Sequence, residues 1–293
     1  MKFVTYLDGK KDVAGVLSAD GKWVYSLEQL GYPYHSIQEL IEAFTPELKD
    51  DISVKMQNQG EGIALDEVKL TAPIPYPKHD VICLGHNYLE HAKESFRFRG
   101  EEYVPLKYPT YFGKRVNRAV GHNEAVPAHK DITDMLDYEI ELAIVMGKDC
   151  DHIKEDEVFD YIFGYTILND ISARNLQNNH GGQFFLGKGL DGFTPMGPCI
   201  VTVDEFDNPP NLHMVSRVNG EVRQDNATND FIFDIPFVVS ELSQGIKLKP
   251  GDIIATGTPS GVGMGFQPPK FMKPGDVVEC EIEGIGILSN PIA

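Results

Sequence analysis

The chain has 293 residues, of which 42% are hydrophobic and 24% charged, and its formal net charge at pH 7 is −18. This is the composition of a globular protein that is long enough for a sizeable core and for about two domains. The strong negative charge argues against nucleic acid and anionic membranes as partners. A small anionic substrate is compatible with it, because a metal ion or a few Lys and Arg side chains reverse the field inside a cleft.

The cysteines and the N-terminal residues bear on location. The four cysteines are far apart and form no C-x-x-C pair, which is typical of a reduced protein rather than a disulfide scaffold or a structural zinc site. The first fifteen residues lack the apolar segment of a signal peptide, and no run of about 20 apolar residues would span a membrane. We therefore expect a cytoplasmic protein.

Short strand-like runs and one helical stretch, SIQELIEAF (36–44), occupy residues 1–70. A connector punctuated by proline, TAPIPYPKHD (71–80), follows them and is typical of a boundary. We expect a small N-terminal α+β domain of residues 1–72 and a main domain of residues 73–293.

The main domain begins with a short apolar run (81–85) that predicts a buried strand and a helix-like segment, NYLEHAKES (87–95). Residues 95–109 are polar, contain arginine and have weak patterning, so they predict a mobile loop.

Strands dominate after residue 136. Asn219-Gly220 lies between two alternating segments and predicts a hairpin, and residues 234–245 predict a helix that ends at a glycine. Residues 248–258 and 272–282 repeat one pattern, a Lys-Pro-Gly-Asp turn that leads into a strand. We expect a mixed α+β, β-rich fold, a sandwich roll with barrel-like character. A Rossmann domain is disfavoured, because no strand is followed by G-x-G-x-x-G.

The strand-like segment LDYEIELAIVMGK (136–148) contains three carboxylates. Strand alternation places Asp137, Glu139 and Glu141 on one face. Like charges at this spacing raise each other's pKa unless a cation lies between them. A hard divalent cation is therefore expected at Glu139 and Glu141, and Asp170, at the end of the apolar run GYTILND, would be the third ligand. The alternative is an ordinary solvated strand face.

His91 and Glu94 are three residues apart on the expected helix and so share a face. A carboxylate beside an imidazole orients the ring and raises its basicity, as a general base requires. The alternative is an incidental surface pair. A zinc site is disfavoured, because His86 and His91 are five residues apart.

Five motifs resemble the fumarylacetoacetate hydrolase family from about residue 80 to 290. In chain order they are LDYEIELAIVMGK, GYTILNDISARNLQ, GKGLDGFTPMGP, VNGEVRQ and GDIIATGTPSGVG. The resemblance implies the β-sandwich roll of that family and Mg²⁺ or Mn²⁺ at Glu139, Glu141 and Asp170. Asp137 then becomes a supporting carboxylate. The resemblance also implies a homodimer.

The same resemblance implies roles for residues of the site. His91 and Glu94 would form the acid–base dyad, on a loop that closes over the substrate. Lys188, between two glycines, would contact the substrate oxygen that becomes an enolate, although a plain turn lysine is the alternative. Gln177 would contact the substrate, and Thr258, in a glycine-rich segment without the ending of a phosphate loop, would bind its carboxylate.

One position departs from the family pattern. Some decarboxylating relatives have arginine where this chain has His86, so a fixed cation is replaced by a titratable group. Arg97 or Arg99 on the expected loop, or Lys114, would then supply the missing positive charge.

These observations predict a Mg²⁺- or Mn²⁺-dependent hydrolase. It would cleave a C–C bond in a 2-oxo acid of the acylpyruvate type, such as a fumarylpyruvate-like compound, through a pyruvate enolate. Oxaloacetate decarboxylation and isomerisation (tautomerisation) of a 2-hydroxydienoate or 2-oxo acid pass through the same intermediate and are the alternatives. A catalytically silent family member that only binds a metal or ligand is an alternative of another class.

Overall fold

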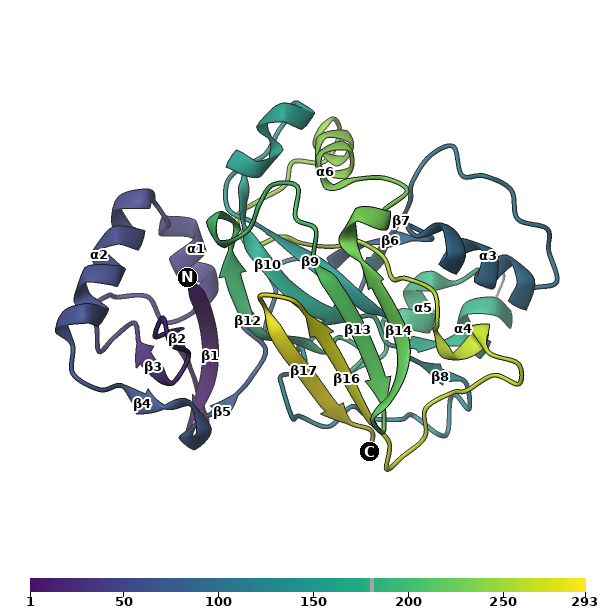
Figure 1. Cartoon of the computed structure of the whole chain (residues 1–293), viewed down its shortest axis with the longest axis horizontal. Helices are drawn as coiled ribbons and strands as arrows, with labels where there is room; N and C mark the ends of the chain where they lie inside the picture. Colours follow the sequence, from purple (N-terminus) through teal and green to yellow (C-terminus); the bar gives the residue numbers. More distant parts are fainter. Residues whose placement is uncertain (180–181) are drawn as a thin grey trace.

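Two β-sheets, packed face to face, form the centre of the molecule (Figure 1). The computed structural model describes residues 1–179 and 182–293. The larger sheet runs in the order β4 (Ile63–Ala64), β3 (Trp23–Ser26), β2 (Lys11–Leu17), β1 (Lys2–Asp8), β12 (Met196–Thr202), β10 (Ile162–Asn169), β9 (Ile140–Met146), β15 (Ile253–Ala255), β6 (Val81–Gly85) and β7 (Thr110–Lys114), with β5 (Lys69–Leu70) paired to β1. The smaller sheet runs β14 (Glu221–Ala227), β13 (His213–Val218), β16 (Val277–Ile282) and β17 (Gly286–Pro291).

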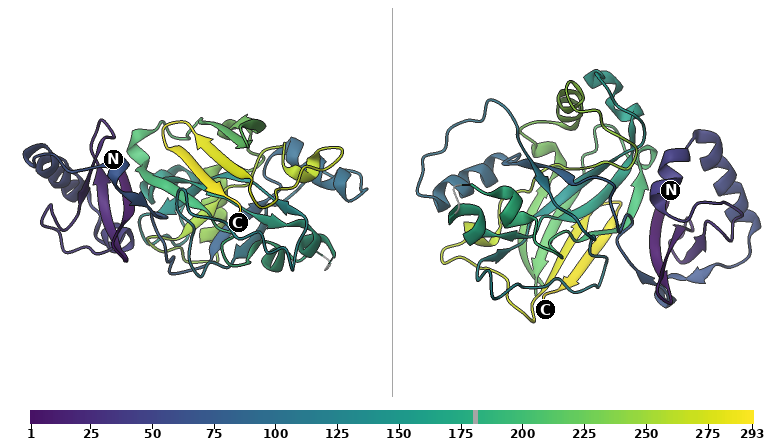
Figure 2. Two further views of the ribbon diagram at one scale, coloured as in Figure 1. Left: turned by 90° about the horizontal axis from the view of Figure 1, so that it is seen from below. Right: turned by 180° about the vertical axis from the view of Figure 1, so that it is seen from behind.

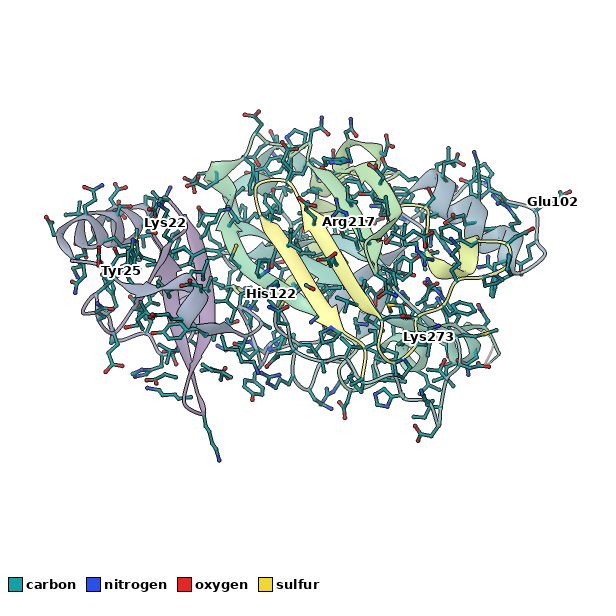
Figure 3. All side chains as sticks on the ribbon, turned by 60° about the horizontal axis from the view of Figure 1, so that its bottom comes forward. Lys22, Tyr25, Glu102, His122, Arg217 and Lys273 are labelled. Atoms are coloured by element: carbon teal, nitrogen blue, oxygen red, sulfur yellow. The ribbon has the colours of Figure 1, made fainter. Side chains whose placement is uncertain are left out.

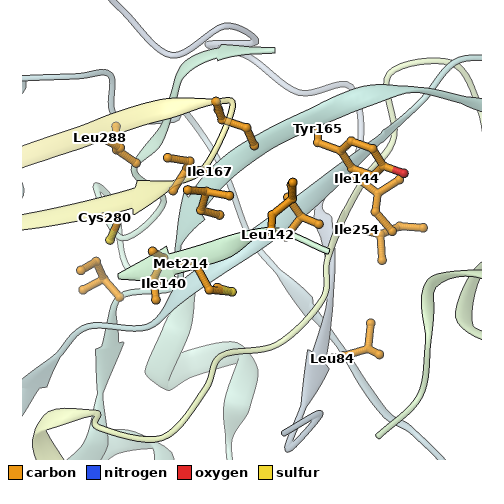
Figure 4. Packing of buried hydrophobic residues seen from close by; sticks show 14 of the residues in the cluster. Leu84, Ile140, Leu142, Ile144, Tyr165, Ile167, Met214, Ile254, Cys280 and Leu288 are labelled. Carbon is orange, nitrogen blue, oxygen red and sulfur yellow. The ribbon is translucent and has the colours of Figure 1, made fainter. Parts of the chain in front are cut away.

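Apolar side chains on alternate positions of the strands form the core between the sheets. Ile140, Leu142 and Ile144 of β9 project toward this core, as strand alternation predicts, and meet side chains from the smaller sheet (Figure 4). Ala143 and Val145 project to the other face and join a second apolar cluster that includes the N-terminal residues. The mixed, β-rich sandwich is therefore confirmed.

The sandwich roll does not form a closed barrel within the described residues. The larger sheet has two ends, β4 and β7, and does not close on itself. Its extra strands come from the N-terminus, because β1 pairs antiparallel with β12 and extends the sheet sideways.

The N-terminal residues form a lobe beside the sandwich, as Figure 2 shows from two sides. Two helices cover its strands, α1 (Ile37–Ala43) and α2 (Pro46–Asn58), and a short 3₁₀ helix, η1 (Leu65–Glu67), follows β4. The sequence pattern predicted α1 and missed α2, in which only Ile52 is buried and apolar periodicity is weak. Its cap was a usable signal, since the Thr45 side chain accepts the Leu48 N–H and Pro46 is the first helical residue. The domain boundary at residue 72 stays a prediction.

The predicted turns of the main domain are confirmed. The hairpin of β13 and β14 has Asn219 at φ 53° and Gly220 at φ 79°, the left-handed pair that a tight two-residue hairpin requires. In the repeated Lys-Pro-Gly-Asp turns, the carboxylates of Asp252 and Asp276 accept the backbone N–H groups three residues earlier. All four cysteines are buried and free.

The remaining elements lie around the sandwich. They are α3 (Leu89–Phe98), α4 (Arg174–Asn179), α5 (Phe184–Lys188), α6 (Ile235–Ser243), the paired short strands β8 (Leu136–Asp137) and β11 (Ser172–Ala173), and the 3₁₀ helices η2 (Glu155–Asp160), η3 (Val203–Glu205), η4 (Thr228–Asp230) and η5 (Gly263–Gly265). Figure 1 shows α3, α4 and α5 together on the side away from the N-terminal lobe. None of the helices in the described ranges is long and apolar enough to cross a membrane.

Two segments differ from their sequence interpretation. Segment 136–148 is two strands, because the chain leaves β8 after Asp137 and enters β9 at Ile140. The expected loop of residues 95–109 begins later, since α3 continues to Phe98 and buries Ser95.

Candidate active site

Strand pairing brings three carboxylates together at one end of the larger sheet. Glu141 of β9 pairs with Leu168 of β10, and Asp170 follows directly where β10 ends. The Asp170 N–H donates to the carbonyl of Glu139 at 2.8 Å, which fixes the two residues side by side. One oxygen of each carboxylate lies within 4.8 Å of the others, and Glu139, Glu141 and Asp170 are all buried.

Two lysines neutralise part of this acidic cluster. Lys188 Nζ donates to Glu139 Oε2 and to Asp170 Oδ2, each at 2.7 Å, and Lys114 Nζ donates to Asp170 Oδ1 at 2.6 Å. Burial alone would lower the pKa of Lys188, but Asp170 and Glu139 raise it above its ordinary value. Lys188 is therefore held as an ammonium ion.

Arg174 and Asp137 form the support behind the cluster. Arg174 Nε donates to Asp137 Oδ2 at 2.9 Å, and its Nη2 lies 2.6 Å from Glu139 Oε1. Asp137 also accepts the N–H groups of Gly263 and Met264. Burial would raise the pKa of Glu139, but Lys188 and Arg174 reverse this effect and lower it. Asp137 is thus a structural anchor for Arg174, and Arg174 was missed at the sequence level.

Glu141 is the carboxylate without a cation. It accepts one hydrogen bond, from the Gly257 N–H at 2.8 Å, and has no ion-pair partner in residues 1–179 and 182–293. Burial, together with the charges of Asp170 and Glu139, raises the pKa of Glu141 well above its ordinary value. The site therefore holds four buried carboxylates against three buried cations, and it has an excess negative charge.

This arrangement fits a hard divalent cation. Mg²⁺ and Mn²⁺ prefer carboxylate oxygens, and an added cation would relieve the repulsion at Glu141. Glu139, Glu141 and Asp170 are the residues that would hold it, while Asp137 is already occupied by Arg174 and two backbone N–H groups.

Helix α3 places His91 and Glu94 at the edge of the acidic cluster. His91 Nδ1 lies 3.6 Å from Glu94 Oε2, just beyond hydrogen-bond distance, and it has no hydrogen-bond partner in the described part of the chain. Glu94 accepts the Gly261 N–H at 3.0 Å and 3.1 Å. The carboxylate is thus fixed by the 256–265 segment, and a small rotation of the His91 side chain would bring the imidazole within hydrogen-bond distance of it.

A narrow cavity lies next to the acidic cluster and His91. Its lining comes from the end of β6, α3, β7, α4, α5 and the segment after β15, and consists of Leu84, Gly85, His86, His91, Ser95, Phe112, Glu139, Arg174, Gln177, Phe184, Lys188 and Thr258. The cavity volume that is open to the centre of a water molecule is about 20 Å³. This is room for little more than one water molecule. A bulky ligand would need this site to open.

His86 begins the turn between β6 and α3 with φ 58°, a left-handed conformation that is uncommon for a side-chain-bearing residue. Its ring centroid lies 6.0 Å from that of His91. Burial, with smaller contributions from His91 and Arg99, lowers the pKa of His86 to about 3. His86 is therefore a neutral imidazole near pH 7 and does not replace a fixed cation.

Gln177 and Thr258 both line the cavity. Gln177 Oε1 accepts a hydrogen bond from Arg174 Nη1 at 3.0 Å. Thr258 Oγ1 accepts one from Gln224 Nε2 at 2.7 Å. Lys188 is the last residue of α5 rather than part of an open turn.

Three side chains were expected to supply the positive charge that is missing at His86, but they lie elsewhere. Lys114 is fully buried behind Asp170, where it also donates to the carbonyls of Ile171 and Lys188. Arg97 is exposed on α3, outside the cavity lining, and Arg99 pairs with Glu101. Glu102, farther along this segment, projects at the outer end of the molecule (Figure 3). The structure thus offers Lys188 and Arg174, rather than these three side chains, as the cations nearest a ligand.

Comparisons with known proteins identify the family of the chain. The family model for the fumarylacetoacetate (FAA) hydrolase C-terminal domain matches residues 80–293. The oxaloacetate tautomerase YisK of Bacillus subtilis is 48% identical over 229 residues, which are 78% of this chain and 74% of that protein.

Solved structures extend the similarity to the whole chain. A fumarylacetoacetate hydrolase from Exiguobacterium antarcticum is 37% identical with a TM-score of 0.81, and the match covers 100% of this chain and 99% of that one. Maleylpyruvate hydrolase from Sphingobium sp. SYK-6, solved with manganese(II) and pyruvate, is 29% identical with a TM-score of 0.78 and the same coverage. The chain therefore belongs to the fumarylacetoacetate hydrolase family.

Proposed function

We propose that this protein is a Mg²⁺- or Mn²⁺-dependent enzyme that interconverts the keto and enol forms of a small 2-oxo dicarboxylic acid such as oxaloacetate. The observation that carries the proposal is the cavity, where the Lys188 ammonium group and an imidazole nitrogen of His91 that has no hydrogen-bond partner among the described residues meet Glu139. Glu139 is one of three clustered carboxylates that could hold a metal. The 48% identity to a protein named oxaloacetate tautomerase supports the same substrate class.

Each group in the site would have a different role in the reaction. A bound Mg²⁺ or Mn²⁺ would supply Lewis-acid stabilisation of the negative charge that develops on the 2-oxo oxygen. Lys188, held as an ammonium ion, would stabilise the same oxygen by its positive charge. A direct hydrogen bond to that oxygen would replace the one that Lys188 Nζ donates to Ser172 Oγ at 2.9 Å. Thr258 would hold the carboxylate next to the 2-oxo group.

The proton would move at His91. In the keto-to-enol direction, His91 with Glu94 takes a proton from C3, the C2–C3 double bond forms, and the oxygen on C2 gains a proton. The reverse direction returns the proton to C3, so the exchange needs neither a water molecule nor a leaving group.

Hydrolytic C–C cleavage of an acylpyruvate is the second candidate, and the His91–Glu94 pair favours it. A histidine beside a fixed carboxylate can activate water for attack on a distal carbonyl, after which the pyruvate enolate leaves. The similarity to a maleylpyruvate hydrolase supports this reading. Like tautomerisation, it requires the site to open, because either substrate exceeds the cavity.

A substrate panel separates the candidates. The protein is stripped with a chelator, reloaded with Mg²⁺ or Mn²⁺, and assayed with enol oxaloacetate, acetylpyruvate and fumarylpyruvate, with pyruvate release measured in parallel. We expect metal-dependent loss of enol absorbance above the uncatalysed rate and little pyruvate from oxaloacetate. Faster cleavage of an acylpyruvate would establish the hydrolase instead. Pyruvate release from oxaloacetate that keeps pace with enol loss would establish a decarboxylase, and metal-induced thermal stabilisation without turnover would establish a silent binding protein.

A further inference from the structure

Gln224 is a fully buried amide in β14 that connects three parts of the active-site end of the sandwich. Its Oε1 accepts the backbone N–H of Ile140 at 3.2 Å and the hydroxyl of Ser216 at 2.9 Å. Its Nε2 donates to Thr258 Oγ1 at 2.7 Å and to the carbonyl of Pro259 at 2.8 Å. Each end of the amide therefore has two partners.

The orientation of this amide follows from its partners. A backbone N–H only donates, so the group facing Ile140 must be the amide oxygen. A carbonyl only accepts, so the group facing Pro259 must be the amide nitrogen. A flipped Gln224 would leave both backbone groups unsatisfied in a buried place, which costs about 1–3 kcal/mol for each group.

The direction of the hydrogen bond at Thr258 follows in turn. Gln224 Nε2 occupies an acceptor site of the Thr258 hydroxyl, so that hydroxyl is free to donate its own hydrogen. No group in the described ranges 1–179 and 182–293 accepts this hydrogen, and Thr258 lines the cavity.

We propose that Gln224 is a positioning residue that commits the Thr258 hydroxyl to donating a hydrogen bond into the cavity, and that the acceptor there is a carboxylate of the substrate. This inference rests on the proposed function. A carboxylate only accepts, so a pre-set donor matches it without any reorganisation when the ligand enters. A ligand with an amide nitrogen or an ammonium group at that position would place a second donor against the Thr258 hydroxyl and bind more weakly.

Gln224 also ties this donor to the acidic cluster. Its oxygen is held by the N–H of Ile140, the residue between Glu139 and Glu141. One side chain thus sets the distance between the strand that carries two candidate metal ligands and the segment that carries Thr258. The two ends of a chelating 2-oxo carboxylate would be recognised in a single rigid frame.

The test is a double-mutant cycle on ligand binding. The probe is oxalate, titrated by calorimetry into protein saturated with Mn²⁺, and the affinity for Mn²⁺ alone is measured separately. Gln224→Met and Thr258→Val should each raise the oxalate Kd about tenfold, the loss typical of one hydrogen bond to a charged group. The double variant should raise it no further than the larger single effect, because both changes remove one interaction. The affinity for Mn²⁺ should stay within twofold.

Gln244→Met is the matched control, since Gln244 makes amide hydrogen bonds to Ile153 and Ser240 at the end of α6, outside the cavity lining. It should leave the oxalate Kd unchanged. If Gln224→Met does not fold, Ser216→Ala takes its place, because it removes one donor to the Gln224 oxygen and leaves the amide itself. It should raise the oxalate Kd two- to threefold, and only when Thr258 is present.

The outcomes separate the two ideas. Independent effects, in which the fold-changes of the two single variants multiply, would overturn the positioning role and leave the proposed function standing. An unchanged oxalate Kd in Gln224→Met would do the same. Failure of the wild-type protein to bind oxalate in the presence of Mn²⁺ would overturn the proposed function itself, and the inference with it.

Discussion

Replacing Glu141 by glutamine should leave the metal-free protein as stable as the wild type or more stable, and should abolish its stabilisation by metal. Glutamine keeps the shape of the side chain, and its amide oxygen can still accept the Gly257 N–H. What it removes is the one buried carboxylate of the cluster that has no cationic partner among residues 1–179 and 182–293. An ordinary buried acid behaves in the opposite way, because its removal breaks an ion pair.

The expected magnitudes follow from the geometry. Two like charges 4.8 Å apart repel by about 3 kcal/mol at an effective dielectric constant of ~20. The raised pKa of Glu141 means that protonation already relieves part of this repulsion, so the gain in the metal-free state lies between zero and that bound. A metal at 100 times its Kd stabilises the wild type by about 2.7 kcal/mol, which is roughly 5 °C in Tm for a chain of this size.

The assay is thermal unfolding at pH 7.5, first with chelator and then with Mn²⁺ at increasing concentration. Glu124→Gln is the matched control, because Glu124 accepts from Arg118 and from the Gly121 N–H away from the site. The control should lose about 1 kcal/mol without metal and keep the full Mn²⁺ shift. A Glu141→Gln protein that melts several degrees lower in chelator, or that keeps the Mn²⁺ shift, would refute the reasoning about excess charge.

Three further predictions concern the proposed chemistry and assembly. Lys188→Met should lower kcat for tautomerisation and for any C–C cleavage alike, by at least a hundredfold in steady-state assays; a selective loss of one reaction would contradict a shared enolate. His91→Ala should lower kcat by about 10²–10⁴-fold while the Mn²⁺ affinity measured by calorimetry is kept, and wild-type turnover in this variant would remove His91 from the mechanism. Light scattering at micromolar concentration should give the mass of a homodimer, and a monomer mass would end that expectation.

The acidic cluster could be predicted from the sequence because the pattern that indicates it is local. A strand alternates faces every residue, so Glu139 and Glu141 had to point the same way, and a carboxylate at the end of an apolar strand marked Asp170. The hairpin at Asn219-Gly220 was accessible for a similar reason, since few residues tolerate its backbone angles.

The positions of the positively charged side chains around the cluster could not be predicted in the same way. Arg174 reaches Asp137 and Glu139 only because β8 pairs with β11, and that pairing joins segments more than thirty residues apart. Lys114 looked like an available cation at the end of a strand, yet tertiary packing encloses it behind Asp170. Gln224 stood in a motif that carried the resemblance, but three of its four hydrogen bonds go to two segments that are remote in the sequence. The sequence pattern did not show which side chains of remote segments come into contact.

The pairing of β1 with β12 has a consequence for any shortened form of this protein. Residues Lys2 and Phe3 cover the backbone of Ile200 and Val201, so removal of the N-terminal lobe would turn β12 into a free edge strand. It would also uncover Phe163, which packs against Phe3. An edge with unpaired N–H and C=O groups beside newly exposed aromatic surface invites self-association. We expect residues 73–293, produced alone, to aggregate even though the cavity and its side chains lie entirely within them.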